Sequence, residues 1–410
     1  MRRFRIFVWL LAAALWNAAL VADPPQRRDR GEQVVSRVDE IFGKVSDILG
    51  LKIRRPVPRA VISRDRIRQY VEQRMKETLK AEDIHAQETV LKKFGFVPQD
   101  FDLKAQTLDL LTEQAAAFYD FKSKKLYVAD WAAKSMEDIA VVHELAHALA
   151  DQHFNLEKFI NKSGNDDDAD TARGSVVEGQ ASWVMTEYMM RQMGRSLKDS
   201  PELAKTAVES TAGSAKDFPV FSKEPLYIRE TMLFPYTQGM LFQQAVFERM
   251  GRDAFAEVFR RPPQTSQQVM HAEQYFSRAA ATRPALPPVS LPGYKKLGEG
   301  TIGELDHQIL LEQFLGKAEA RDLAPRWRGG RYALWENKKE NRDVLVYAVE
   351  WANAEDAAHY FADYRKAAAK KWKRLEATSE SPEQVAGTGD DGRFQWTLRG
   401  AVFTSVEGLP

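Results

Sequence analysis

The sequence of 410 residues predicts a mainly helical α+β protein that ends in a small α+β domain. Three observations support this fold class. Apolar residues recur at helical spacing in most of the longer segments. Short apolar runs bounded by turn residues predict strands in two separate parts of the chain. A proline-rich stretch over 281–298 predicts a linker between a helical part at 60–280 and the small domain at 299–410.

The first part of the chain combines short strands with longer helices. Apolar residues such as Val38 and Ile41 predict a helix within the N-terminal segment 23–59. Further helices are expected at 64–79, 87–94, 136–152, 170–193, 235–250 and 252–259, and strands at 60–62, 115–120 and 125–129. A short turn at 121–124 makes the last two strands a hairpin. Strand 125–129 could offer its edge to an extended peptide or lie inside a sheet.

The segment beyond the linker predicts a compact domain of its own. Helices are expected at 302–315 and 354–371, and strands at 331–336, 344–351, 393–398 and 401–406. The last two strands should pair as a terminal hairpin. Five of the nine tryptophans lie beyond the linker, at strand and helix positions that favour core packing over a ligand-binding surface.

Charge and composition exclude several classes of protein. The chain has 59 Lys and Arg against 58 Asp and Glu, and a net charge of +1. No basic stripe stands out, so nucleic acid is not an expected partner. The sequence contains no cysteine. Disulfides, a thiol nucleophile, a cysteine-ligated zinc site and a lipid-anchored lipoprotein are therefore excluded.

The N-terminus has the pattern of a secretion signal. Arg2, Arg3 and Arg5 precede an apolar run at 6–20, and small residues lead to a cleavage site after Ala22. The apolar run is short for a membrane span, which needs about 20 residues, so a signal peptide at 1–22 is preferred over an uncleaved anchor. We therefore expect an exported protein, periplasmic or extracellular, with no membrane span after cleavage.

A five-residue motif carries the chemistry. His143-Glu144-Leu145-Ala146-His147 fits the pattern HExxH. On a helix the two histidines lie about 40° apart on one face, where both can bind the same Zn²⁺. Glu144 falls on a neighbouring side, close enough to a metal-bound water to act as general base without being a ligand. A core helix that carried two histidines by chance would have no use for this carboxylate.

The third ligand has two candidates. His153 has the spacing of the third histidine in metzincins, but Ala150 stands where those proteins have a turn-making glycine. Alanine favours continuation of the helix, which would turn His153 away from the metal. Glu178 lies in an apolar helical segment, where an acidic residue needs a partner. His143, His147 and Glu178 are therefore the preferred zinc ligands.

The motif pair His143-Glu144-x-x-His147 and Glu178-Gly179-x-Ala181 resembles gluzincin-type metallopeptidases. Segments 143–154, 234–239 and 262–275 are similar to a group of exported bacterial metallopeptidases without a settled substrate. The resemblance covers roughly 118–275. Ala272 stands where that group's pattern would have proline, which puts the role of the neighbouring His271 in doubt.

This resemblance implies a zincin-like metallopeptidase domain over 60–280, with Zn²⁺ as cofactor and a peptide or protein as substrate. Zinc would activate a water molecule, and Glu144 would take its proton and pass it to the leaving amine. The oxyanion needs a further donor, for which Tyr236, His271 and Tyr275 are candidates.

Other interpretations stay open at this point. The alternative function is a non-catalytic binding protein of the cell envelope, with or without zinc. Glu144 favours catalysis, because structural zinc sites usually have four protein ligands and need no base. The acidic segment 166–170 is interpreted as a solvated loop at a helix start rather than a Ca²⁺ site. Asp151 is a candidate partner for His147. The oligomeric state is not predicted.

Overall fold

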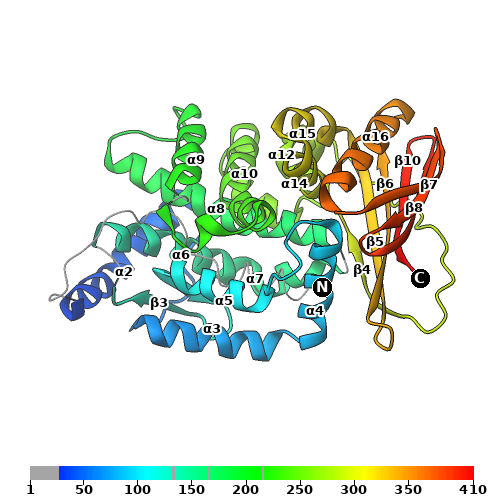
Figure 1. Ribbon diagram of the computed structural model, residues 1–410. Coiled ribbons are helices and arrows are strands. Elements are labelled where there is room, and N and C mark those ends of the chain that lie inside the picture. The colour runs from blue at the N-terminus through cyan, green and yellow to red at the C-terminus, as the bar shows by residue number, and fades with distance from the viewer. Residues whose placement is uncertain (1–26, 132–133, 165, 215–216) are drawn as a thin grey trace.

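The computed structural model describes residues 27–131, 134–164, 166–214 and 217–410 (Figure 1). The signal peptide predicted at 1–22 lies outside these residues. The described chain is mainly helical and contains two sheets, which confirms the predicted α+β class. None of its helices is both long and apolar enough to cross a membrane.

The N-terminal elements are α2 (Arg27–Leu49), β1 (Arg59–Ile62), α3 (Arg64–Thr78), α4 (Ala81–Phe94) and α5 (Leu103–Gln114). Side chains cap two of these helices, since Ser63 accepts a hydrogen bond at the start of α3 and Asp102 does so at the start of α5. Helix α4 begins before the expected residue 87, and α5 was not predicted. Such short helices are stabilised by tertiary packing more than by their own sequence.

A three-stranded sheet lies beside the helices. It is formed by β1, β2 (Ala117–Asp120) and β3 (Lys125–Ala129), in the order β1-β3-β2. Strands β2 and β3 form the predicted antiparallel hairpin, while β1 pairs in parallel with β3. Strand β3 is therefore the central strand, and the suggestion that its edge could receive a peptide is wrong.

The helices that follow complete the larger part of the molecule. They are α6 (Lys134–Phe154), α7 (Leu156–Ile160), α8 (Asp167–Gln192), α9 (Glu202–Ser214), α10 (Leu226–Met250), α11 (Ala254–Arg260), α12 (Ser266–Met270) and α13 (Ala272–Phe276). Helix α6 packs between α2, β2 and α8, and α8 packs along α10. We expected a helix to start at Pro235, but α10 runs through this residue. Proline removes one helical hydrogen bond, and the burial of the surrounding residues outweighs that loss.

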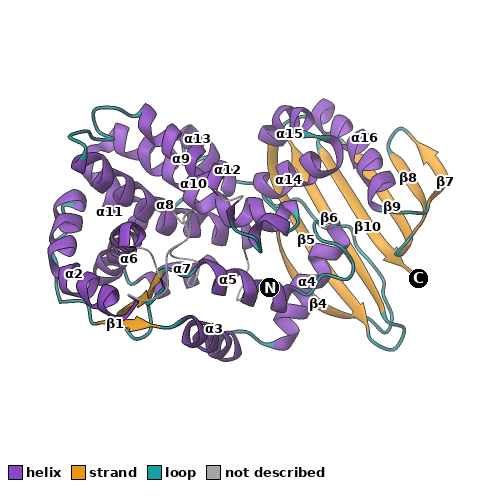
Figure 2. Ribbon diagram, turned by 60° about the vertical axis from the view of Figure 1, so that its left-hand side comes forward, coloured by secondary structure: helices purple, strands orange, loops and turns teal. Residues whose placement is uncertain are grey.

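The C-terminal part is built on one large antiparallel sheet. Its strands are β4 (Lys295–Thr301), β5 (Trp327–Asn337), β6 (Arg342–Trp351), β7 (Leu375–Ser381), β8 (Gln384–Gly389), β9 (Gly392–Arg399) and β10 (Val402–Leu409), in the order β4-β5-β6-β10-β9-β8-β7. Its helices are α14 (Glu304–Leu315), α15 (Lys317–Leu323) and α16 (Ala354–Lys371), and α16 packs against β6, β9 and β10 (Figure 2). The predicted terminal hairpin is confirmed by β9 and β10.

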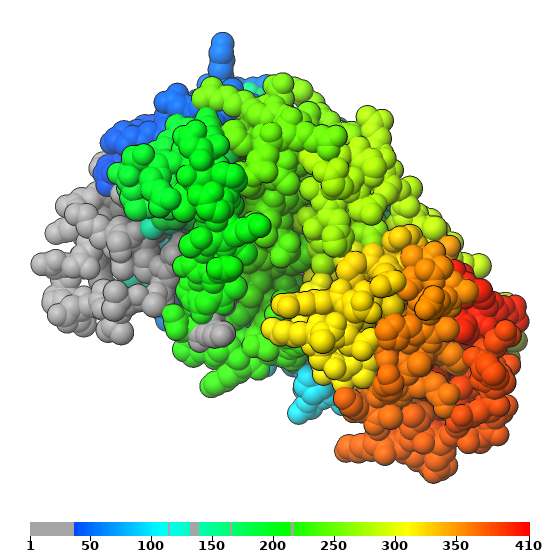
Figure 3. Space-filling model, turned by 90° about the horizontal axis from the view of Figure 1, so that it is seen from above, coloured from blue at the N-terminus to red at the C-terminus, as the bar shows by residue number. Residues whose placement is uncertain are grey.

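The C-terminal part packs directly against the helices. Viewed from above, it forms one contiguous lobe, yellow to red, beside the green helices (Figure 3). One hydrophobic cluster runs from Val38 in α2 to Phe403 in β10 and includes residues of both parts. Polar contacts also cross the junction. The Tyr227 hydroxyl donates to Asp306, and the Gln267 amide donates to the Trp327 carbonyl oxygen.

Candidate metal centre

Three potential metal ligands meet between α6 and α8. Nε2 of His143 lies 3.1 Å from Oε2 of Glu178, and Nε2 of His147 lies 3.3 Å from the same oxygen. The two imidazole rings are nearly perpendicular, with centroids 4.7 Å apart. All three side chains are buried, and their ligand atoms lie within 4.8 Å of one another. This His–His–Glu group could hold a metal ion.

Two glycines set the helix crossing beside this group. A Cβ on Gly179 of α8 would lie 2.2 Å from the backbone carbonyl carbon of Gly239 in α10. A Cβ on Gly239 would lie 2.4 Å from the carbonyl oxygen of Ser175. No side chain fits at these distances, so the close approach of the two backbones requires glycine. The crossing holds Glu178, the neighbour of Gly179, against the part of α10 that carries Tyr236.

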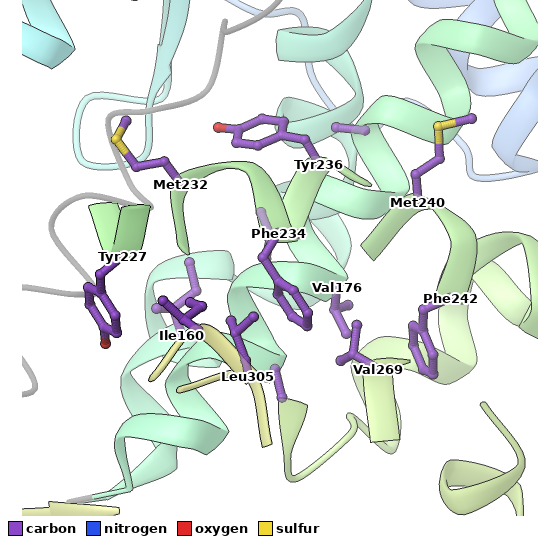
Figure 4. Close-up of a cluster of buried hydrophobic side chains, with 14 of the residues drawn as sticks. Ile160, Val176, Tyr227, Met232, Phe234, Tyr236, Met240, Phe242, Val269 and Leu305 are labelled. Carbon is purple, nitrogen blue, oxygen red and sulfur yellow. The ribbon is translucent and has the colours of Figure 1, made fainter. Parts of the chain in front are cut away.

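Tyr236 reaches the His–His–Glu group from α10. Its ring stacks on that of His143 with centroids 5.9 Å apart. Burial, and then the nearby carboxylates of Glu178 and Glu144, raises the pKa of Tyr236 well above its usual value, so its hydroxyl keeps its proton. Tyr236 and Phe234 leave α10 in different directions, and Phe234 points into the apolar core (Figure 4). Helix α10 thus contributes to the core and, through Tyr236, to the site.

Glu144 lies in the same buried region with one oxygen in use and one free. Its Oε2 accepts a hydrogen bond of 2.7 Å from the backbone N–H of Tyr119 in β2. Its Oε1 is buried and has no hydrogen-bond partner. Burial, and secondly the charge of Glu178, raises the pKa of Glu144 well above its usual value. A carboxylate in this environment can take up a proton and hold it, as a general base requires.

The donor set fits a divalent metal ion. Burial lowers the pKa of His143, which favours the neutral imidazole that binds metals. Burial acts against ionisation of Glu178, but the two imidazoles outweigh it and lower the pKa of Glu178 to about 2. Oε1 of Glu178 is buried without a hydrogen-bond partner, which is rare in folded proteins unless a ligand satisfies such an atom. Two histidines and one glutamate are also the ligands of many catalytic zinc sites.

The other candidates near the end of α6 have different partners. The helix continues through His153, whose Nε2 lies 2.8 Å from the carbonyl oxygen of Lys52. Asp151 accepts from the hydroxyl of Tyr119 and from the ammonium group of Lys124. Asp151 therefore joins the end of α6 to the β2–β3 hairpin, and its described contacts do not include the two histidine ligands.

Two of the predicted oxyanion donors have partners outside the His–His–Glu group. Nε2 of His271 lies 2.7 Å from Oε1 of Glu304 at the start of α14, and this hydrogen bond raises the pKa of His271. The Tyr275 hydroxyl donates to the carbonyl oxygen of Arg261. In the part of the chain that the structure describes, neither side chain has a hydrogen bond, ion pair or ring contact with the His–His–Glu group. The function proposed below uses neither of them.

The acidic segment at the start of α8 is not solvated, so that interpretation is wrong. Asp167 accepts a hydrogen bond from the hydroxyl of Tyr332, and Asp168 accepts one from the backbone N–H of Ser266. Both aspartates are buried at the junction with the C-terminal part. Burial raises the pKa of Asp168 to about 8. Gly303 leaves room for the buried carboxylate, since a Cβ at this position would lie 2.0 Å from Oδ1 of Asp168.

Comparison with known proteins adds little about activity. A family model described as a domain of unknown function (DUF8575) matches residues 291–410. No curated protein matches the chain. A crystal structure from Chloroflexus aurantiacus, provisionally described as a hydrolase with a novel fold, is similar with 18% identity and a TM-score of 0.38. The match covers 68% of this chain and 95% of that chain. So distant a likeness carries no functional conclusion, and the side chains of the site must supply it.

Proposed function

We propose that this chain is an exported zinc metallopeptidase of the gluzincin type, with His143, His147 and Glu178 as metal ligands and Glu144 as general base. One observation carries the proposal. The His–His–Glu group is buried next to a carboxylate that has one oxygen without a hydrogen-bond partner. A site that held zinc only for stability would need a fourth ligand and would have no use for this base.

The chain's own residues have separate tasks in peptide-bond hydrolysis. A zinc ion, when bound, supplies Lewis acidity, which lowers the pKa of water and polarises a carbonyl group. Oε1 of Glu144 takes the proton of the attacking water and later delivers it to the leaving amine. The hydrogen bond from Tyr119 to Oε2 holds the carboxylate in place while Oε1 exchanges the proton.

Tyr236 is the donor that we assign to the developing oxyanion. It is the one of the three predicted donors with a ring contact to a proposed ligand, His143. Its raised pKa keeps the hydroxyl protonated, so that it can donate a hydrogen bond at neutral pH. The glycine crossing of α8 and α10 fixes the distance between this hydroxyl and Glu178.

Fold and location belong to the same proposal. The motif helix α6 beside a small sheet, with the third ligand on the next long helix, is the arrangement expected of a zincin-like domain. Export is supported by the basic N-terminus, the apolar run at 6–20 and the small residues before Asp23. N-terminal sequencing of the native protein should find a start near Asp23, and a chain that still begins at Met1 would exclude cleavage.

Metal content tests the ligand assignment. Protein dialysed against zinc-free buffer should retain about one Zn²⁺ per chain, and His143→Ala or Glu178→Ala should retain almost none. His153→Ala is the matched control, because it removes a histidine of the same helix that contacts Lys52 instead. Loss of zinc in the control with retention in Glu178→Ala would reverse the assignment of the third ligand. Retention of zinc by His143→Ala would exclude the site altogether.

A further inference from the structure

A second set of metal-ligand side chains lies on the C-terminal part. Glu319 and Asp322 are three residues apart on α15, and His359 and Asp363 are four residues apart on α16. Such spacings place each pair on one face of its helix. The two helices lie side by side in both ribbon views (Figures 1 and 2). The ligand atoms of Glu319, Asp322 and His359 lie within 4.8 Å of one another.

The contacts around His359 differ from those of an ordinary ion pair. Its Nε2 lies 2.7 Å from Oε1 of Glu319 and 3.5 Å from Oδ2 of Asp363. Both oxygens are buried, and neither has a hydrogen-bond partner. The Asp363 side chain has no exposed surface at all. One N–H group can donate fully to only one oxygen, and a cation held between the imidazole and the two carboxylates would give both oxygens a partner.

The neighbouring cations do not occupy that position. Lys366 binds the other oxygen of Asp363, at 2.7 Å. Arg326 lies 3.6 Å from Asp322 and bonds more closely to a different carboxylate, that of Asp356. The carboxylates of Glu319 and Asp363 therefore approach the same Nε2 of His359, at 2.7 and 3.5 Å. A divalent cation between the carboxylates would relieve their repulsion.

We propose that Glu319, Asp322, His359 and Asp363 form a second metal site, which takes a divalent transition-metal ion such as Zn²⁺ and ties α15 to α16. The imidazole ligand selects this class of ion, because Ca²⁺ and Mg²⁺ prefer sites made of oxygen alone. His359 is partly exposed, whereas the His–His–Glu group is buried. The second ion therefore exchanges with solvent, and it is independent of the proposed catalysis.

The test counts ions on the full chain. Protein stripped with a chelator and then equilibrated with saturating Zn²⁺ should carry two ions by elemental mass spectrometry. His359→Ala and Glu319→Gln should each carry one, and so should His143→Ala, while His143→Ala with His359→Ala should carry none. The matched control is His85→Ala, since Nε2 of His85 also lies 2.7 Å from a carboxylate, Glu336, but as a simple hydrogen bond.

The control separates a built site from loose surface binding. His85→Ala should keep both ions. An equal loss in His85→Ala and His359→Ala would mean adventitious zinc on exposed histidines and would overturn the proposal. Two ions in His359→Ala, or two in Glu319→Gln, would overturn it as well. Melting curves without zinc show whether each variant is folded, and Asp363→Asn gives a further variant that removes a ligand while nearly preserving its shape.

Discussion

Glu144 is the residue whose replacement separates catalysis from metal binding. Glu144→Gln keeps the size of the side chain and an oxygen that can accept from Tyr119, but it cannot take up a proton. We expect zinc content and melting temperature close to those of the wild type. Hydrolysis of an unstructured protein substrate should fall by a factor on the order of 10² or more.

His153→Ala should retain full activity in the same assay. Zinc loss in Glu144→Gln would show that this carboxylate supports the metal directly. A wild-type protein that holds zinc but cleaves nothing in a broad peptide library, even after its N-terminus is trimmed, would favour the non-catalytic envelope protein.

Asp168 gives a pH dependence at the level of one buried carboxyl group. Its pKa is raised from 3.8 to about 8, mainly by burial and also by the charges of Asp306 and Asp166. Between these pH values the folded chain binds a proton that the unfolded chain lacks. The protonated carboxyl therefore stabilises the fold at low pH, and this stabilisation is lost as the pH rises from about 4 to about 8.

Asp168→Asn should remove that loss, because its amide stays neutral and can still accept from Ser266. The variant should be more stable than the wild type at pH 8, and the difference should shrink towards pH 5. Urea unfolding across this range measures it, at about 1.4 kcal/mol for each unit by which the pKa is raised. Asp199→Asn, at an exposed position, should show no such trend. A constant difference at all pH values would contradict the burial argument.

The close crossing of helices α8 and α10 requires glycine at position 179. Gly179→Ala would place a methyl group 2.2 Å from the backbone of Gly239, so the helices must move apart. Overpacking of this kind typically costs about 1–3 kcal/mol or more. We expect a lower melting temperature and weaker zinc binding, because Glu178 moves with its neighbour.

Gly43→Ala is the matched control within α2, where a Cβ would meet nothing within 4 Å. That change should stabilise the chain by up to about 1 kcal/mol, as alanine does in a helix interior. Equal effects of the two substitutions on stability and zinc content would show that the crossing has no special role.

The elements also show what a sequence can and cannot predict. The sequence predicts the helix of the HExxH motif and the helical position of Glu178 because each pattern lies within one or two helical turns. The prediction that a helix starts at Pro235 was wrong, because local helix propensity does not reveal that the residues on both sides of this proline are buried. The parallel pairing of β1 with β3 and the contact of Gly179 with Gly239 join residues far apart in the chain. No local pattern carries such information, since an isolated glycine such as Gly179 does not show which segment it approaches.

The hydrophobic core that the helical part and the C-terminal part share predicts that the whole molecule unfolds in a single transition. Buried contacts such as Tyr227 with Asp306 and Tyr332 with Asp167 join the two parts. A chain that ends at Leu286 would lack Tyr332, the partner of Asp167, and Asp306, the partner of Tyr227. It would also expose the apolar side chains of α10 that pack against α14 in the full chain. We expect one transition in calorimetry for the full chain and poor solubility for the shortened one. Two well-separated transitions, or a stable shortened chain, would show that the parts fold independently.

Helix α8 connects the C-terminal part of the chain to the candidate metal centre. One unbroken rod carries Asp167 and Asp168 at its start, against the C-terminal part, and Glu178 further along, at the metal centre. Ten residues of helix span about 15 Å, so α8 sets the distance between this junction and the metal centre. The buried aspartates at the junction and the candidate ligand therefore keep a fixed separation as long as α8 stays helical.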